Sequence, residues 1–136
     1  MRIFLGITVA TAVNFLLGLV GFQVVSNSLL LSFSPEISTE ISSINYLSSF
    51  TLKYLVITVL TWIMFKVMPL LDKPRKRILF IFLLGSAFTV YNEINLFWAG
   101  TSFNWSIVMV IGESLNWLVT GYVLSRFMKP KHIGAQ

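Results

Sequence analysis

Residues 54–88 read YLVITVLTWIMFKVMPLLDKPRKRILFIFLLGSAF, and this stretch decides the fold. Two long apolar runs flank the short basic segment DKPRKR at 72–77. Neither run alternates polar and apolar residues, as a half-buried strand would. Because the basic segment is so short, the second run must return through the same apolar medium beside the first. The pattern predicts an antiparallel pair of helices within a membrane.

The rest of the chain has the same apolar character. Of its 136 residues, 56% are hydrophobic and 11% are charged, and the mean hydropathy is +0.82. An average globular protein has about 25% charged residues, so a soluble fold this small would lack charges to cover its surface. Runs of about 20 apolar residues can cross the hydrocarbon core as helices. Four runs, at about 3–25, 47–70, 78–99 and 105–127, predict one all-α integral membrane domain over 1–136, a four-transmembrane-helix bundle.

The lysines and arginines predict the orientation of this bundle. If the four spans alternate in direction, nine of the ten positive residues fall on the side of the 72–77 segment, and only Lys53 falls toward the other side. The nine are Arg2, Lys66, Lys73, Arg75, Lys76, Arg77, Arg126, Lys129 and Lys131. Positive residues in short loops stay on the cytoplasmic side. We therefore expect both termini to lie in the cytoplasm (N-in/C-in), together with the C-terminal tail 128–136. The expected location is a cell inner (cytoplasmic) membrane.

The loop 26–46, expected outside, is the longest polar stretch. Its SPE at 34–36 is typical of a helix start, with a capping hydroxyl, a proline and then an acid. The isoleucines Ile37, Ile41 and Ile44 follow at helical spacing. A short amphipathic helix on the outer surface and a serine-rich loop both fit this pattern.

Three ionisable residues from three spans fall in nearly one layer. Lys53 and Glu93 lie roughly 9 Å, and Glu113 roughly 12 Å, inside the outer ends of their helices at the helical rise per residue. Polar neighbours on the same helix faces are Thr89 and Asn92 in the third span and Asn116 and Thr120 in the fourth. Ionisable groups at such depth are costly, so they are functional candidates by default. The layer predicts a hydrated pocket, open to the outside, that binds a substrate or a proton.

A structural role fits the same layer. Lys53 and Glu93 lie close enough to the outer interface for their charged ends to reach it. An ion pair from Lys53 to either glutamate would also hold helices together. Glu113 is the deepest of the three, and its short side chain makes this alternative weakest there.

Small residues recur in the first span at intervals of four, at Gly6, Ala10, Asn14 and Gly18. Such spacing lets a second helix approach closely, and the Asn14 amide can hydrogen-bond across the contact. The partner helix is expected within the same chain, with a homodimer as the alternative.

Motifs for catalysis and for metal binding are missing from the sequence. The chain has no cysteine, and its one histidine, His132, lies in the polar C-terminal tail. No phosphate-binding loop or nucleophile motif occurs. We therefore expect no metal, no cofactor and no enzymatic activity. Because the positive residues flank apolar segments, they predict contact with the lipid bilayer rather than with nucleic acid.

Two functions from different classes fit these observations. The first is a small transporter or flippase, acting as a homo-oligomer, that moves a polar, cationic or lipid-linked solute by means of the intramembrane glutamates. The second is a non-catalytic accessory, assembly or immunity-type partner of a larger membrane protein, whose helices would satisfy the same polar groups.

Overall fold

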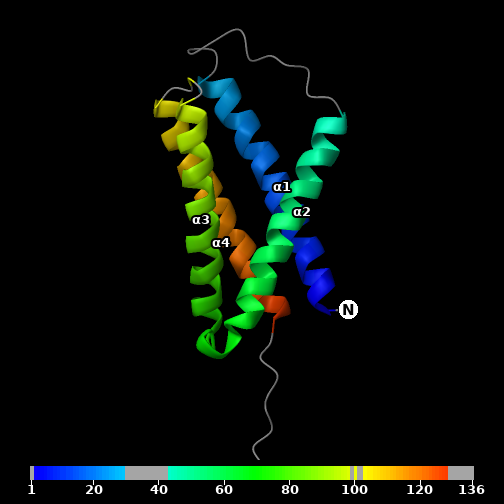
Figure 1. Ribbon diagram of the computed structural model, residues 1–136. Coiled ribbons are helices and arrows are strands. Elements are labelled where there is room, and N and C mark those ends of the chain that lie inside the picture. The colour runs from blue at the N-terminus through cyan, green and yellow to red at the C-terminus, as the bar shows by residue number, and fades with distance from the viewer. Residues whose placement is uncertain (1, 30–42, 99, 101–102, 129–136) are drawn as a thin grey trace, which may run out of the picture.

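Four long helices make up the fold (Figure 1). This computed structural model describes residues 2–29, 43–98, 100 and 103–128. The elements are α1 (Arg2–Leu29), α2 (Ser43–Lys66), the short 3-10 helix η3 (Met68–Leu70), α3 (Pro74–Trp98) and α4 (Phe103–Phe127). Each α-helix is long and apolar enough to cross a bilayer, and the described residues contain no strand. Within these residues, the prediction of an all-helical fold with four membrane-length helices is confirmed.

Prolines explain why the turn between the second and third spans lies four residues earlier in the chain than the sequence predicted. The second span does not continue to 70, because α2 ends at Lys66 and η3 follows. Pro69 lies in η3 and has no N–H with which to extend the hydrogen bonds of α2. The third span starts before 78, because α3 begins at Pro74, whose fixed φ suits the first position of a helix. Only residues 71–73 therefore separate η3 from α3.

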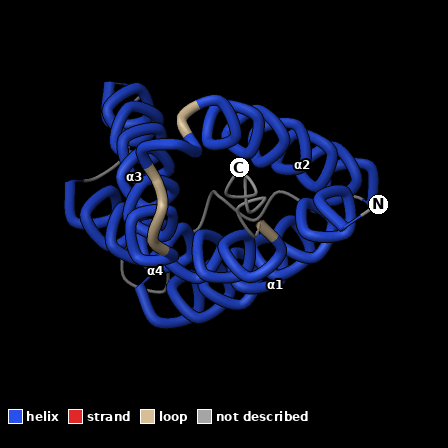
Figure 2. The backbone as a smooth tube through the Cα atoms, turned by 90° about the horizontal axis from the view of Figure 1, so that it is seen from below, coloured by secondary structure: helices blue, strands red, loops and turns tan. Residues whose placement is uncertain are grey.

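The helices are arranged so that α4 lies between α3 and α1, and α1 packs in turn against α2 (Figures 1 and 2). The hairpin joins α2 to α3, but these two helices diverge from it and have little mutual contact (Figure 1). The hairpin, the start of α1 and the end of α4 lie together at what we name the hairpin end. The opposite end is named the loop end.

The apolar core lies in the half of the bundle nearer the hairpin end. Its fully buried side chains include Ile57, Leu60 and Met64 of α2, Ile81 of α3 and Leu124 of α4. Each of these residues belongs to the half of its helix that approaches the hairpin. The helices thus converge on one core here, whereas α2 stands away from α3 toward the loop end.

Glycines allow α3 and α4 to approach closely. A Cβ atom at Gly121 of α4 would lie 2.9 Å from the backbone oxygen of Ile78 in α3. A Cβ atom at Gly85 of α3 would overlap the ring of Trp117 in α4. Small residues are the usual means by which membrane helices come into contact. These two positions therefore fix how α4 sits on α3.

The outward faces of all four helices carry large apolar side chains. Exposed examples are Phe4, Leu16, Trp62, Leu83 and Leu115. Soluble monomers rarely expose apolar surface this extensive. In lipid the same side chains meet a solvent of their own polarity, and the helices satisfy their backbone hydrogen bonds internally.

Arg77 ties the hairpin to the end of α4, a role beyond its predicted contribution to the charge of that side. Its Nε donates a hydrogen bond to the Leu71 carbonyl at 2.9 Å, and its Nη2 donates to the Asp72 carbonyl at 2.8 Å. Its Nη1 donates to the carbonyl of Met128, just after α4. Arg77 is only 2% exposed. We name this set of contacts the Arg77 clamp.

An exposed ion pair also lies at the hairpin. The Lys76 Nζ atom is 2.7 Å from the Asp72 carboxylate, and both side chains are more than half exposed. The hydrogen bond and the positive charge of Lys76 hold the pKa of Asp72 below its ordinary value. Because both groups face solvent, the pair contributes little to stability.

Two predicted features lie outside the described residues. One is most of the amphipathic helix expected around 37–44, because the described part of the chain resumes at Ser43 with α2. The other is nearly all of the tail 128–136, of which only Met128 is described.

Candidate binding site

Asn14 connects α1 to both α2 and α4. It is fully buried, and its Oδ1 atom accepts a hydrogen bond from Lys53 Nζ at 2.9 Å. Its Nδ2 atom donates to the Thr120 hydroxyl at 2.9 Å, and its backbone carbonyl accepts from Asn116 Nδ2 at 2.9 Å. One residue in an apolar span thus links α1 to polar groups from two other helices.

An ion pair between Lys53 of α2 and Glu113 of α4 lies beside this link. The Nζ and Oε1 atoms are 3.5 Å apart, and the two side chains are 29% and 25% exposed. A Cβ atom at Gly18 of α1 would lie 2.9 Å from Lys53 Nζ and 3.5 Å from Glu113 Oε1. The missing side chain at Gly18 therefore makes room for the ion pair.

The small-residue face of the first span points into the chain itself. Gly6 lies against Phe127 of α4, where an added Cβ would be 2.6 Å from the Phe127 Cβ. Ala10 and Asn14 are fully buried, and Gly18 faces the ion pair. This face packs α1 on α4 and α2.

Glu93 of α3 stands apart from the Lys53–Glu113 pair. It is 5% exposed, and its Oε2 atom has no hydrogen-bond partner. The hydroxyl of Ser106, in α4, lies near this carboxyl and is also buried without a hydrogen-bond partner. The described residues form two ion pairs, Lys53–Glu113 and Lys76–Asp72, and neither involves Glu93. The predicted layer thus divides into a paired acid and an unpaired one.

Trp117 and Thr89 form the next layer toward the hairpin end. The indole Nε1 atom donates to the Thr89 hydroxyl at 3.1 Å, and this hydroxyl donates to the Gly85 carbonyl at 3.1 Å. The indole ring packs over Gly85 and is 7% exposed. These contacts hold the Trp117 ring in one orientation between α3 and α4.

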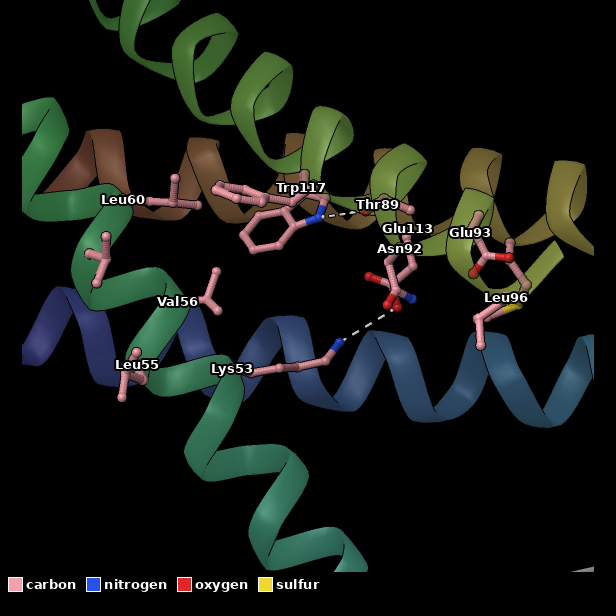
Figure 3. A pocket seen from close by; sticks show the side chains of 13 residues that line it. Lys53, Leu55, Val56, Leu60, Thr89, Asn92, Glu93, Leu96, Glu113 and Trp117 are labelled. Carbon is pink, nitrogen blue, oxygen red and sulfur yellow. Dashed lines mark hydrogen bonds and ion pairs between the residues drawn. The ribbon is translucent and has the colours of Figure 1, made fainter. Parts of the chain in front are cut away.

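A cavity of about 560 Å³ lies between α2 on one side and α3 and α4 on the other (Figure 3). Its charged and amide residues are Lys53, Asn92, Glu93 and Glu113, with Leu96 and Met109 beside them. Its apolar wall toward the hairpin end is formed by Val56, Val59, Leu60, Phe88 and Trp117. Along α2, Lys53 and Leu60 are roughly 10 Å apart at the helical rise per residue. The cavity is therefore mainly apolar, and its charged and amide residues lie toward the loop end.

A second cavity, of about 370 Å³, lies between α3 and α4. Its wall is almost wholly apolar and includes Val90, Ile94 and Ile107. Ser106 lines it as well, and Glu93 lines both cavities. Glu93 is therefore buried between two cavities rather than within solid packing.

The structure brings most of the predicted site residues to the first cavity. Those that line it are Lys53, Thr89, Asn92, Glu93 and Glu113. Asn116 and Thr120 instead face α1, where both bond to Asn14. Leu60 and Trp117 were not predicted as site residues, because apolar residues within a span carry no sign of which face they occupy.

The fold and the site define a class, a helical multi-pass membrane protein with a cavity between its helices. No protein-family model, curated protein or solved structure matches this chain. The geometry of the cavity is therefore what bears on its function.

Proposed function

We propose that this protein is a small membrane transporter or flippase that binds an amphipathic solute in the cavity between α2 and α3. The order of polarity along this cavity carries the proposal. A ligand with a polar head and an apolar tail fits it with the head toward the loop end. An amphiphile in the adjacent leaflet has the same orientation, because its tail points to the bilayer centre. It can therefore enter sideways, between the diverging helices, without turning over.

The size of the cavity favours a small solute over a protein partner. Pockets for small molecules commonly occupy about 300–1,000 Å³, and this one has about 560 Å³. One turn of an α-helix, about 10 Å across and 5.4 Å high, fills roughly 400 Å³. The cavity thus holds little more than one turn, whereas a helix needs several turns to cross the bilayer. A cavity of this size therefore fits a small solute better than a whole membrane-spanning helix.

We further propose that the hairpin end lies in the cytoplasm and that the polar end of the cavity faces the outer leaflet of a cytoplasmic membrane. Seven of the nine positive residues predicted for the cytoplasmic side belong to described segments at the hairpin end (Figure 1). They are Arg2, Lys66, Lys73, Arg75, Lys76, Arg77 and Arg126. Such a bias retains an end on the cytoplasmic side.

Orientation is measured by labelling single cysteines, since the natural chain contains none. Asn104→Cys lies at the loop end and Asp72→Cys lies at the hairpin, both at exposed positions. A membrane-impermeant maleimide applied to intact cells should label the first variant and reach the second only after lysis. The reverse pattern would overturn the orientation.

Binding is measured through Trp117, which lines the cavity. In one protein, phenylalanine replaces the other three tryptophans, so that Trp117 is the single reporter. In a matched protein, the single tryptophan is Trp62, which is 62% exposed on the outer face of α2. In phosphatidylcholine nanodiscs, brominated dodecyl amphiphiles with amine, maltoside or sulfate heads quench a nearby indole. We expect at least one probe to quench Trp117 saturably, at lower concentration than it quenches Trp62. Equal or later quenching of Trp117 by every probe would refute the proposal.

A substitution in the cavity wall tests whether this quenching reports entry. Val59→Phe adds bulk to the wall, and Val20→Phe makes the same change at an exposed position of α1 that lines neither described cavity. We expect Val59→Phe to weaken Trp117 quenching and Val20→Phe to leave it unchanged.

Movement across the membrane is measured in vesicles that carry the protein. A dodecyl amphiphile with a nitrobenzoxadiazole label is loaded into both leaflets, and external dithionite bleaches only the outer one. The protein should speed the loss of the protected signal, and Val59→Phe should slow that loss relative to Val20→Phe. Vesicles with and without protein that bleach alike would show binding without transport.

A further inference from the structure

Glu93 is the acid in the described bundle that lacks a counter-charge. It is 5% exposed, its Oε2 atom accepts no hydrogen bond, and the ion pairs within the described segments involve other acids. A carboxylate in the apolar part of a bilayer is costly and is normally paired. The position is therefore suited to a positively charged group from outside the chain.

Lys53 does not supply this charge. Its Nζ atom donates to Asn14 Oδ1 at 2.9 Å and lies 3.5 Å from Glu113 Oε1. Because Lys53 and Glu113 offset each other, Glu93 is the acid at the polar end of the cavity that has no cationic partner within the described residues. A cationic head group is favoured there over a neutral or an anionic one.

The atoms around Glu93 also favour a head group that donates hydrogen bonds. Glu93 Oε2 is buried without a hydrogen-bond partner, and the Ser106 hydroxyl lies beside this carboxyl on the side of the second cavity. An ammonium with N–H groups can donate to this carboxylate oxygen, and the bond gains from the two charges. A quaternary ammonium carries the same charge but has no N–H to donate.

The apolar part of such a ligand has a place to lie. Glu93 lines the same cavity as Val56, Leu60 and Trp117, which lie further toward the hairpin end (Figure 3). A chain bound by its head at Glu93 can extend along this wall toward the bilayer centre.

This inference rests on the proposed function and names its substrate class: we propose that Glu93 binds the protonated amine of an amphipathic primary amine. The contact selects this head group against neutral and anionic amphiphiles that have the same tail.

The test uses the Trp117 reporter protein in nanodiscs and the brominated dodecyl probes. In wild type, the amine probe should bind more tightly than the maltoside and sulfate probes. Glu93→Gln should weaken amine binding at least tenfold, about 1.4 kcal/mol, and leave maltoside binding unchanged. Asp72→Asn makes the same carboxylate-to-amide change at the exposed hairpin and should leave both unchanged, and Glu93→Asp should restore part of the amine affinity.

Two results would overturn the assignment. In the first, the Glu93→Gln variant binds the amine probe as tightly as wild type does. In the second, wild type binds the maltoside and sulfate probes as tightly as the amine probe. Failure of the proposed function has a different signature, because then no probe reaches Trp117 before Trp62. Wild type should also bind the primary amine more tightly than a dodecyl quaternary ammonium probe, and equal affinity for the two would refute the role of the N–H groups.

Discussion

Replacement of Arg77 by methionine should destabilise the bundle by removing the Arg77 clamp. Arg77 is 2% exposed, and its guanidinium donates to three backbone carbonyls, those of Leu71, Asp72 and Met128. These carbonyls belong to the hairpin turn and to the residue that follows α4. Methionine keeps an unbranched apolar side chain, so the change removes hydrogen bonds and charge more than volume.

The expected magnitude follows from these contacts. A hydrogen bond from a charged donor contributes roughly 1.5–3 kcal/mol, so three set an upper range of roughly 4.5–9 kcal/mol. Ordering of an arginine side chain costs about 2 kcal/mol of rotamer entropy, which methionine loses only in part. Water at the membrane interface can also hydrate the freed carbonyls of the turn. We expect a loss of about 3 kcal/mol in the free energy of unfolding, as when a buried charged contact is broken.

The assay is reversible unfolding in mixed micelles of dodecyl maltoside and increasing sodium dodecyl sulfate, followed by circular dichroism. Arg75→Met is the matched control, because Arg75 is exposed in the same turn of α3. Both variants remove one positive charge from the hairpin end, so any effect of charge on orientation is the same in each. The difference between them isolates the hydrogen bonds.

Arg75→Met should change the free energy of unfolding by less than about 0.5 kcal/mol, as exposed substitutions usually do. If Arg77→Met lost no more than Arg75→Met, the three hydrogen bonds would contribute nothing net. The clamp would then be a contact of the folded state without energetic weight, and the reasoning above would be refuted.

Three further predictions concern other contacts. Gly121→Ala should lower the free energy of unfolding by about 1–3 kcal/mol, because the added Cβ meets the backbone of α3. Gly112→Ala is the control in the same helix: its Cβ meets open space, so the variant should gain up to about 1 kcal/mol from helix propensity. A double-mutant cycle of Asn14→Ala and Lys53→Met should give a coupling energy of about 0.6–1.7 kcal/mol in the free energy of unfolding, as for other hydrogen bonds between membrane helices. Additive effects of the two substitutions would exclude the contact. Lys76→Met removes the ion-pair partner of Asp72 and should therefore raise the pKa of Asp72 in a carboxyl NMR titration. The small stabilisation from this pair should be complete above the unfolded-state pKa of about 3.9 and be lost as pH falls through the lower folded-state value.

Length and apolar character along the chain were enough to predict the four membrane-length helices. Each helix satisfies its own backbone hydrogen bonds, so a span can be recognised from its own residues without knowledge of its neighbours. Its ends were less predictable, because hydropathy does not show where a helix stops. Pro69 and Pro74, rather than the edges of the apolar runs, set the ends of the hairpin helices.

The depth of Lys53, Glu93 and Glu113 was also predictable, since the helical rise converts sequence position into depth. Which acid Lys53 pairs with was not predictable, and the sequence left both glutamates open. The choice of Glu113 depends on Asn14 and Gly18 of α1, which receive the lysine on the α1 side of the bundle. Glu93 stays unpaired because it projects from α3, across the cavity from α2.

The sequence by itself determined the class of structure: four apolar helices with a basic hairpin and a polar layer near one end. The tertiary structure alone decided that the layer borders a cavity, that one acid is paired and the other is not, and that Arg77 is a clamp rather than only a charge on one side. The physical reason is that apolar length and charge depend on each helix separately. Pairing and cavities depend on the rotation and tilt of one helix against another, which close contacts such as those at Gly85 and Gly121 set.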